Sequence, residues 1–247
     1  RRQRQMCIRD RYNPIQLFHN NKEIINARYP SAQWDDDTIF NLNNWGHGYY
    51  NKPNESDSFY YDNGSIIDYS NNSNNLYEFV KQQLLLDNSF NLINSLINLN
   101  VGSFKSYTKI VNSYDISDSI NMIKLNYDNV SLWKTKHHYY YLENKLEFLN
   151  SENEYYFDIS SRYLYLRLKD DKNPNNEKIS VKIYPYAFNL SDCNNLTIKN
   201  INFFGTTIKA NNCDYLNVEE CNFKYPSCYS HPLNQINYGE ELNPLDN

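Results

Sequence analysis

The sequence predicts an all-β protein whose C-terminal part is built from stacked parallel coils. Most segments with a clear periodicity alternate apolar and polar side chains, which is the pattern of a half-buried strand. Residues 76–86 give the best amphipathic-helix pattern, because Leu76, Phe79 and Leu84 fall on one face. Near the C-terminus, residues 192–203 recur at an offset of 20, which is typical of a coil in a solenoid.

The composition is that of a folded chain. It has 247 residues, of which 40% are hydrophobic and 16% aromatic, so a sizeable core is possible and general disorder is excluded. The length suits one large β domain or two smaller ones. No run approaches the roughly eighteen apolar residues of a membrane-spanning helix. We therefore expect a folded β protein without a membrane span.

Residues 1–11 differ from the rest of the chain. They contain five Arg, and the core Met6-Cys7-Ile8-Arg9-Asp10 resembles a translated sequencing-adapter scar. The alternative is a basic arm for nucleic acid or membranes; we interpret the segment as an artefact. Without it, 19 basic and 28 acidic side chains give a formal charge of -9. A body this acidic is a poor match to the phosphates of nucleic acid.

Residues 12–185 are expected to form a β-rich lobe that includes the first strands. Asn20-Asn21 separates two apolar segments and predicts a tight hairpin turn. A second hairpin is expected around residues 159–162. Residues 169–178, rich in Asp, Asn and Lys, predict a surface loop. The expected strands are residues 17–18, 23–25, 96–101, 107–111, 154–158, 163–168 and 179–183.

Residues 186–247 are expected to form the first coils of a parallel β-helix. Stacked coils lie about 4.8 Å apart, so residues 20 positions apart would sit above one another. The apolar pairs would then fill a core, and Asn202 would bond Asn222 at a bend. Two unrelated strand–turn units with the same phase are the alternative. The identical pairs are Cys193/Cys213, Leu196/Leu216, Asn202/Asn222 and Phe203/Phe223.

The same stacking bears on the cysteines and on the end of the chain. Cys193, Cys213 and Cys221 are interpreted as small buried apolar side chains, with a Cys193–Cys213 disulfide as the geometric alternative. A solenoid that stopped at residue 247 would expose its last edge and its core. We therefore expect the chain to be a truncated N-terminal fragment with further coils downstream.

Two blocks resemble secreted right-handed parallel β-helix proteins of the pectate-lyase-like family. The first joins residues 16–22 to Ala27-Arg28-Tyr29-Pro30, and the second joins residues 141–149 to residues 154–158 and 164–166. The resemblance covers most of residues 15–223. It implies a right-handed parallel β-helix, truncated after its first coils, behind an N-terminal β-rich and sandwich-like lobe formed in part by residues 31–135.

This sequence departs from the family pattern in its first block. Tyr29 stands where Trp is common, and Asn20-Asn21 replaces the more usual Asp-Gly or Asn-Gly turn. Relatives with these blocks include glycoside hydrolases, pectate-lyase-like lyases and uncharacterised surface proteins. The resemblance therefore implies a fold more strongly than a reaction.

Several side chains are candidates for chemistry. Asp35-Asp36-Asp37 offers carboxylates to calcium, but consecutive residues point in alternate directions, which favours a solvated loop. His137-His138 beside Tyr139-Tyr140-Tyr141 is either a sugar-binding or acid–base cluster or the entry to a strand, and we favour the strand. Trp34, Trp133 and the segment Trp45-Gly46-His47-Gly48 are either platforms for a sugar ring or interior packing.

No catalytic residue is assigned from the sequence. Glycoside hydrolysis needs two carboxylates about 5–10 Å apart, and a lyase needs a base with charge neutralisation. Glu219 and Glu220 lie on a coil, but two coils do not supply that spread of groups. The catalytic groups are therefore expected beyond residue 247. No Cys-x-x-Cys or His-x-x-x-His spacing indicates a metal site, and no cofactor is expected.

The expected function is that of the N-terminal part of a secreted or cell-surface β-helix protein acting on polysaccharide. The reaction would be that of a glycoside hydrolase or a polysaccharide lyase, if the intact protein is an enzyme. The alternative is a non-catalytic extracellular surface or adhesion scaffold that binds carbohydrate or a protein partner. The expected partner is a polysaccharide or glycan, with no role for nucleic acid.

Overall fold

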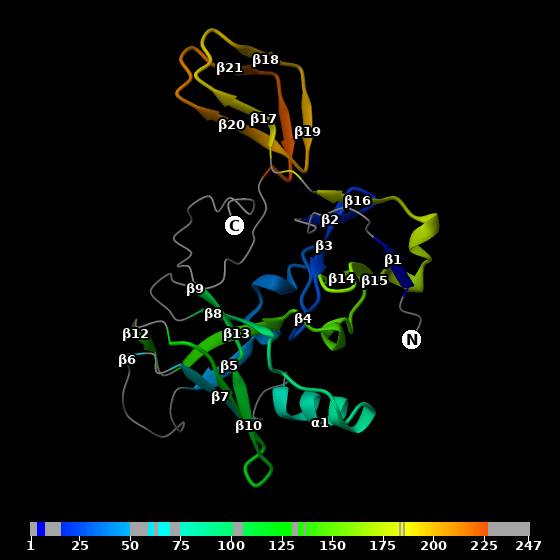
Figure 1. Ribbon diagram of the computed structural model, residues 1–247, viewed down its shortest axis with the longest axis vertical. Helices are drawn as coiled ribbons and strands as arrows, with labels where there is room; N and C mark the ends of the chain where they lie inside the picture. Colours follow the sequence, from blue (N-terminus) through cyan, green and yellow to red (C-terminus); the bar gives the residue numbers. More distant parts are fainter. Residues whose placement is uncertain are drawn as a thin grey trace.

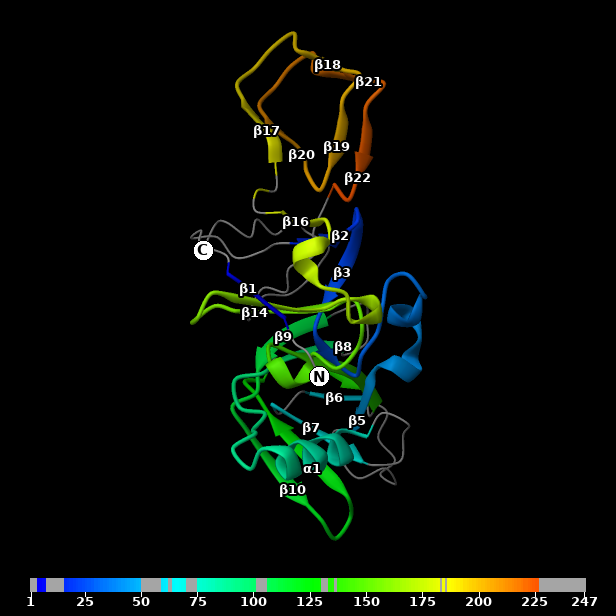
Figure 2. The ribbon, with the colours of Figure 1, turned by 90° about the vertical axis from the view of Figure 1, so that its right-hand side faces the viewer.

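The computed structural model describes ten parts of the chain. For residues 4–7, 59–61, 133–135, 137 and 138 it describes the backbone alone. Figures 1 and 2 show a larger lobe of sheets with one helix on its outer side, and a smaller lobe of stacked strands beside it. The described chain is thus mostly β, as predicted. The described residues are 4–7, 16–49, 59–61, 64–69, 75–100, 106–129, 133–135, 137–182, 184 and 186–226.

The largest sheet has eight antiparallel strands in the order β10-β11-β7-β5-β13-β8-β9, with β4 also paired to β13. Strand β13 is central because it pairs with β4, β5 and β8. The strands are β4 (Arg28–Tyr29), β5 (Gly46–Tyr49), β7 (Ser65–Tyr69), β8 (Leu96–Asn100), β9 (Ser106–Ile110), β10 (Ser113–Ser117), β11 (Met122–Asn126) and β13 (His137–Glu143). Beside it, β6 (Phe59–Tyr61) pairs with β12 (Trp133–Thr135).

One face of this sheet is closed by α1 (Leu76–Leu86), the helix that the sequence predicted. The side chain of Asn75 caps the helix by accepting a hydrogen bond from the N–H of Glu78. Leu76 and Val80 are buried in the core cluster that also contains Ile66 and Leu99 of the sheet. The lobe is therefore a curled sheet closed by a helix, where we had expected a sandwich-like arrangement.

A second sheet has six strands in the order β1-β15-β14-β3-β2-β16. Both predicted hairpins are confirmed in it, since β2 pairs with β3 and β14 with β15 in antiparallel fashion. Asn20 and Asn21 have φ values of 50° and 62°, as a two-residue turn with primed geometry requires. The strands are β1 (Arg4–Cys7), β2 (Gln16–His19), β3 (Lys22–Asn26), β14 (Glu154–Asp158), β15 (Tyr163–Arg167) and β16 (Ile179–Lys182).

Strand β1 lies within the segment interpreted as an artefact, and its backbone pairs with β15. This pairing does not test whether residues 1–11 are a sequencing artefact, so that interpretation stays a prediction. The segment between β15 and β16 forms two short turns, η4 (Lys169–Asp171) and η5 (Pro174–Asn176), in the region where a surface loop was expected.

Residues 186–226 form two turns of chain that lie one against the other (Figure 1). Three strand pairs join them, all parallel: β17 (Tyr186–Ser191) with β20 (Thr207–Asn211), β18 (Thr197–Lys199) with β21 (Asn217–Glu219), and β19 (Asn202–Phe204) with β22 (Asn222–Lys224). The predicted register is observed, since Ile198 pairs with Val218 and Phe203 with Phe223. Elsewhere in the described residues the sheets are antiparallel, apart from β3 with β14, and no longer solenoid is present.

The Phe pair shows how closely the two turns match. The rings of Phe203 and Phe223 are stacked with centroids 4.5 Å apart and planes inclined by 5°. This spacing is close to the distance of about 4.8 Å between neighbouring strands, so the rings follow the backbone repeat. Phe203 is buried, and Phe188 meets it edge-on at 6.1 Å.

The corners of the two turns share an uncommon backbone conformation. Four positions in each turn have positive φ, a conformation that Gly, Asn and Asp adopt more easily than other residues. The first turn uses Asp, Asn or Gly at all four corners, whereas the second uses Tyr or Glu at three. The pairs are Asp192/Asn212, Asn195/Tyr215, Asn200/Glu220 and Gly205/Tyr225.

The predicted contact between Asn202 and Asn222 is wrong. These residues are in register but exposed, and the polar pair that links the two turns lies at an earlier corner. There the Nδ2 group of Asn212 donates to Oδ1 of Asp192, because these side chains stand at stacked positive-φ corners.

The cysteines are partly exposed, not fully buried. Cys193, Cys213 and Cys221 are free thiols. The thiol groups of Cys193 and Cys213 each lie 3.2 Å from the carbonyl oxygen two residues earlier. Each of these thiols thus bonds the backbone beside it and stays partly exposed.

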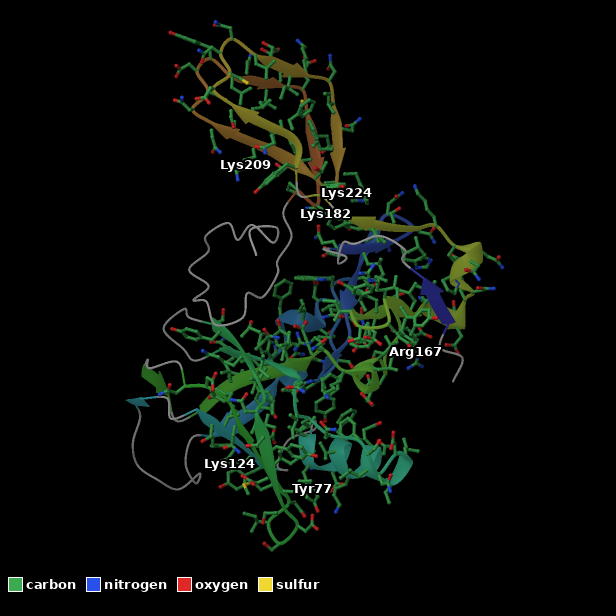
Figure 3. The ribbon with its side chains drawn as sticks, viewed as in Figure 1. Tyr77, Lys124, Arg167, Lys182, Lys209 and Lys224 are labelled. Atoms are coloured by element: carbon green, nitrogen blue, oxygen red, sulfur yellow. The ribbon has the colours of Figure 1, made fainter. Side chains whose placement is uncertain are left out.

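The small lobe rests on the six-stranded sheet through an aromatic cluster. The ring of Phe18 on β2 lies 4.8 Å from Phe204 and 5.1 Å from Tyr225. A Cβ atom on Gly205 would approach the Phe18 ring to 3.3 Å, so glycine suits this corner for space as well as for its φ of 65°. Figure 3 shows Lys182 at this junction, where its Nζ group donates to the carbonyl of Pro226 at 3.5 Å.

Candidate functional site

The alternation of β5 places two glycines on the core face of the large sheet. A Cβ atom on Gly46 would lie 2.5 Å from the ring of Tyr140, and one on Gly48 would lie 2.0 Å from Ile66. Glycine is needed at both positions because these larger side chains fill the space. The intervening His47 and the following Tyr49 therefore project from the opposite face of the strand.

On that opposite face, aromatic side chains from neighbouring strands come together. The rings of His47 and Tyr139, which are paired across β5 and β13, stack at 5.0 Å with an angle of 16°. Tyr49 lies 4.9 Å from His47. It also meets Tyr69 of β7 edge-on at 5.7 Å. We call the set the ring row, and its members are Trp45, His47, Tyr49, Tyr69, Tyr139 and Tyr141.

A buried cation stands at one end of the ring row. The guanidinium carbon of Arg28 lies 3.8 Å from the centroid of the Tyr141 ring and 5.1 Å from that of Trp45. Its Nε group donates to the carbonyl of Pro30 at 2.9 Å, and an Nη group donates to the carbonyl of Asn44 at 3.0 Å. Arg28 is 1% exposed, and burial lowers its pKa. It therefore orders the end of the row and the loop that leads into β5.

Two buried carboxyl groups interact electrostatically with this cation. Glu143 accepts a hydrogen bond of 2.9 Å from Asn98, whose Oδ1 accepts one of 2.6 Å from Thr108. Glu154 accepts one of 3.1 Å from the N–H of Ser151. Burial raises the pKa of Glu143 to about 7 and that of Glu154 to about 8, although the charge of Arg28 opposes both shifts.

A third buried carboxyl group lies under the ring row on the core face. Asp68 accepts a hydrogen bond from the hydroxyl of Tyr140. Burial raises the pKa of Asp68 to about 7, while the hydrogen bond from Tyr140 opposes the shift. All three carboxyl groups are enclosed, so they support the face instead of presenting acid–base groups to a substrate.

These three shifts predict how stability varies with pH. The folded chain keeps the protons on Asp68, Glu143 and Glu154 up to about pH 7 to 8, whereas carboxyls of the unfolded chain titrate near pH 4. The stabilisation from these groups is therefore complete below about pH 4 and is lost as the pH rises towards 8.

We expect the melting temperature to fall between pH 5 and pH 8.5, and Glu154→Gln to make this decline shallower. The melting temperature is measured at each pH by circular dichroism at constant ionic strength. Glu78→Gln, at an exposed helix position, is the matched control and should leave the slope unchanged. A wild-type melting temperature that rises across this range would contradict the assignment.

The structure places the other candidates apart from the ring row. Asp35, Asp36 and Asp37 are all exposed in the loop before η1 (Thr38–Phe40). Oδ1 of Asp36 accepts hydrogen bonds from the N–H and the hydroxyl of Thr38. Trp34 is in the same loop and is exposed. Glu219 and Glu220 form ion pairs with Lys199, at 3.1 Å and 3.9 Å.

Some expected site residues have only a described backbone. His137 and His138 begin β13, as a strand entry would, and Trp133 is in β12, but their side chains lie outside the described residues. Within the described ranges, no three His, Cys, Asp or Glu side chains are grouped closely enough to hold a metal ion. Nor does any described helix have the length and apolarity to cross a membrane.

The sequence indicated only part of the ring row. The Trp45-Gly46-His47-Gly48 segment was a candidate, and its alternation with glycine signals which side chains face outwards. Tyr139 and Tyr141 were candidates only beside His137-His138, because it is the pairing of β13 with β5 that brings them to the face of His47. The contribution of Arg28 likewise depends on the pairing of β4 with β13.

Comparison with known proteins gives one informative match. No family model matches the chain, and no curated protein matches it. A solved structure named "Glycoside hydrolase" aligns with a TM-score of 0.52 over 90% of this chain, at 12% sequence identity. The chain spans about a third of that structure, since the match covers 32% of its length. The two proteins are similar in fold.

Proposed function

We propose that this chain is the N-terminal part of a secreted or cell-surface protein that acts on polysaccharide, and that its two stacked turns begin a right-handed parallel β-helix. The observation that carries the proposal is the parallel register of three strand pairs at an offset of 20 residues. The similarity in fold to a protein named glycoside hydrolase supports a carbohydrate-related role. In this proposal, residues 12–185 are the β-rich lobe, and residues 186–247 belong to the β-helix.

The different exposure of two stacked apolar side chains supports the presence of further coils. Ile198 in the first turn is 4% exposed, whereas its partner Val218 in the second turn is 42% exposed. An apolar ladder that is covered on one side and open on the other suits the addition of another coil. The proposal therefore places the groups that carry out chemistry on coils that follow the two described turns.

The ring row supports a role for the β-rich lobe in holding the glycan. Aromatic faces pack well against the C–H groups of sugars, while their polar edges and neighbouring amides bond hydroxyl groups. Tyr139, His47 and Tyr49 are partly exposed, and Asn100, which pairs with Tyr139, is exposed. The lobe would thus position polysaccharide for the solenoid.

A non-catalytic scaffold is the second candidate function. It is favoured by the state of the carboxyl groups, because Glu143 and Glu154 are buried against Arg28 and Glu219 is paired with Lys199. In that case the same aromatic face and solenoid would bind carbohydrate or a protein partner without cleaving it.

A polysaccharide panel separates these functions. The 247-residue chain and a longer version that includes downstream sequence are assayed for binding and for chain cleavage. We expect both to bind at least one polysaccharide, and the longer one to release new reducing ends, as a hydrolase does, or unsaturated ends, as a lyase does.

Tyr139→Ala should weaken binding about tenfold, whereas Tyr215→Ala, at an exposed corner of the small lobe, should not. Binding without cleavage by the longer chain would favour the scaffold. If neither chain bound any polysaccharide, the polysaccharide function would be rejected, and only a scaffold for a protein partner would remain.

A further inference from the structure

The loop that links β4 to β5 is held in one conformation by its own hydrogen bonds. The N–H of Gln33 donates to the hydroxyl of Thr38 at 2.8 Å, and the N–H of Ile39 donates back to the carbonyl of Gln33 at 3.2 Å. The indole N–H of Trp45 donates to the carbonyl of Ile39 at 3.1 Å. The loop contains η1 and a second short turn, η2 (Leu42–Asn44).

The loop is also fixed to the β-rich lobe. The side chain of Gln33 donates to the carbonyl of Glu152 at 2.9 Å, and the hydroxyl of Ser31 donates to Asn150 at 2.6 Å. Figure 2 shows η1 and η2 in blue at the side of this lobe, away from the small lobe. A surface loop with this many internal and external bonds is preorganised, so a ligand that binds it does not need to order it.

Large apolar side chains project from this ordered loop into solvent. Trp34 is 44% exposed and Phe40 is 73% exposed, and their rings meet edge-on at 6.0 Å. Leu42 on η2 is also exposed. Single exposed apolar residues are common, but two adjacent aromatic rings on a braced loop form a patch of the kind that marks interaction sites.

The surroundings of the rings are polar and acidic. Asp35, Asp37, Asn41 and Asn43 are all exposed on the same short loop. Carboxylates accept hydrogen bonds from hydroxyl groups, and amides both accept and donate them, while the negative charges repel carboxylates on a ligand. The chemistry of this rim therefore favours a polyhydroxylated ligand without charge.

We infer that Trp34 and Phe40 form a second glycan-binding platform, distinct from the ring row, which selects neutral polysaccharide over polysaccharide rich in uronic acid. The inference rests on the proposed function and deepens it by naming the substrate class. The two rings supply apolar faces for sugar rings, and the Asp and Asn side chains around them bond the hydroxyls. Trp45 joins the two sites, because it belongs to the ring row and bonds the platform loop.

Binding measurements on the 247-residue chain test the platform. The probes are soluble xylan and mixed-linkage glucan as neutral ligands, and polygalacturonate and alginate as anionic ones, in affinity gels and calorimetry. We expect wild type to bind at least one neutral polymer and to bind the anionic ones at least tenfold more weakly. Trp34→Ala and Phe40→Ala should each weaken neutral binding about tenfold, as loss of a central aromatic contact does.

The charge of the rim is tested separately. Asp35→Asn combined with Asp37→Asn should leave neutral binding within about twofold and strengthen binding of polygalacturonate at low salt, because the repulsion is removed. Tyr215→Ala removes an aromatic ring that is 82% exposed on the small lobe, and it serves as the matched control that should bind like wild type.

Each failure has a different meaning. Neutral binding that is unchanged in both Trp34→Ala and Phe40→Ala, but reduced in Tyr139→Ala, would overturn the platform and leave the proposed function standing. Tighter wild-type binding to polygalacturonate than to the neutral polymers would overturn the substrate class. No binding to any polymer would reject the proposed function itself, and concentration-dependent self-association lost in Trp34→Ala would instead assign the loop to contact between copies of the chain.

Discussion

Replacement of Arg28 by methionine should lower the free energy of unfolding by about 3–5 kcal/mol at pH 8, because a buried cation with two carbonyl acceptors and two carboxyl groups nearby is removed. Methionine keeps the chain length of the side chain but removes its charge and its donors. Glu143 and Glu154 then lose the cation that opposes the effect of burial on their pKa values. The carbonyls of Pro30 and Asn44 also lose their donor. Urea denaturation followed by tryptophan fluorescence measures the change.

The pH dependence of this loss distinguishes charge from packing. At pH 5 both carboxyls are protonated in the folded variant, so the loss should shrink by about half or more. Lys81→Met is the matched control, because Lys81 pairs with Asp118 on the surface at 3.3 Å, where solvent screens the charges and the pair contributes little to stability. A loss for Arg28→Met below about 1 kcal/mol at pH 8 would show that the cluster does not depend on its cation.

Phe203→Ala is expected to destabilise the small lobe by about 3–5 kcal/mol, as is usual for removal of a buried Phe side chain. Phe203 is 4% exposed and lies between the rings of Phe188 and Phe223. Removal of this ring leaves a cavity between the two turns, beside the ring of Phe223. Because this lobe has its own core, the effect should be read from amide hydrogen exchange of residues 186–226 as well as from global unfolding.

Phe223→Ala provides the comparison for this prediction. Phe223 is only half-buried, so its removal should destabilise the lobe by roughly half as much. Fast exchange should be confined to the small lobe in both variants, while α1 and the eight-stranded sheet keep wild-type protection. Equal effects of Phe203→Ala and of the exposed substitution Tyr215→Ala would be incompatible with the stacked core.

The parts of the fold that the sequence predicted are those with local signals. The Asn20-Asn21 turn, the helix at residues 76–86 and the hairpin at residues 154–167 each depend on neighbours within a few positions. The coil register is not local, but near-identical residues recur at a constant offset, and this repetition is visible in the sequence.

The arrangement of the eight-stranded sheet had no comparable signal. Strand β13 pairs with β4, β5 and β8, and each of these pairings joins segments that are distant in the chain. The sequence predicted a strand entry at His137-His138 but no strand at residues 46–49, and alternation alone does not show which strands are neighbours. The ring row and the position of Arg28 depend on this pairing. The sequence therefore made His47 a candidate without showing which side chains would surround it.

Corner geometry explains the remaining differences from the prediction. The sequence repeat suggested Asn202 over Asn222 as the polar ladder, because these residues are identical. The ladder instead links Asp192 to Asn212, where positive φ angles turn both side chains to the same corner. Identity of residues in a repeat shows which positions stack, whereas side-chain contacts also depend on the backbone angles at each position.

Disulfide trapping across the two turns tests the central claim, the parallel register at an offset of 20 residues, most directly. Thr197 and Asn217 are exposed partners on β18 and β21, and neighbouring strands bring Cα atoms to about 4.8 Å, within the range that a disulfide spans. With the native cysteines replaced by serine, Thr197→Cys with Asn217→Cys should form an intrachain disulfide on mild oxidation, as seen by mass spectrometry of the linked peptides. Thr197→Cys with Glu219→Cys, two residues out of register, should form it far more slowly. Equal trapping of both pairs, or preferred trapping of the second, would contradict the stacked coils and the polysaccharide function proposed from them.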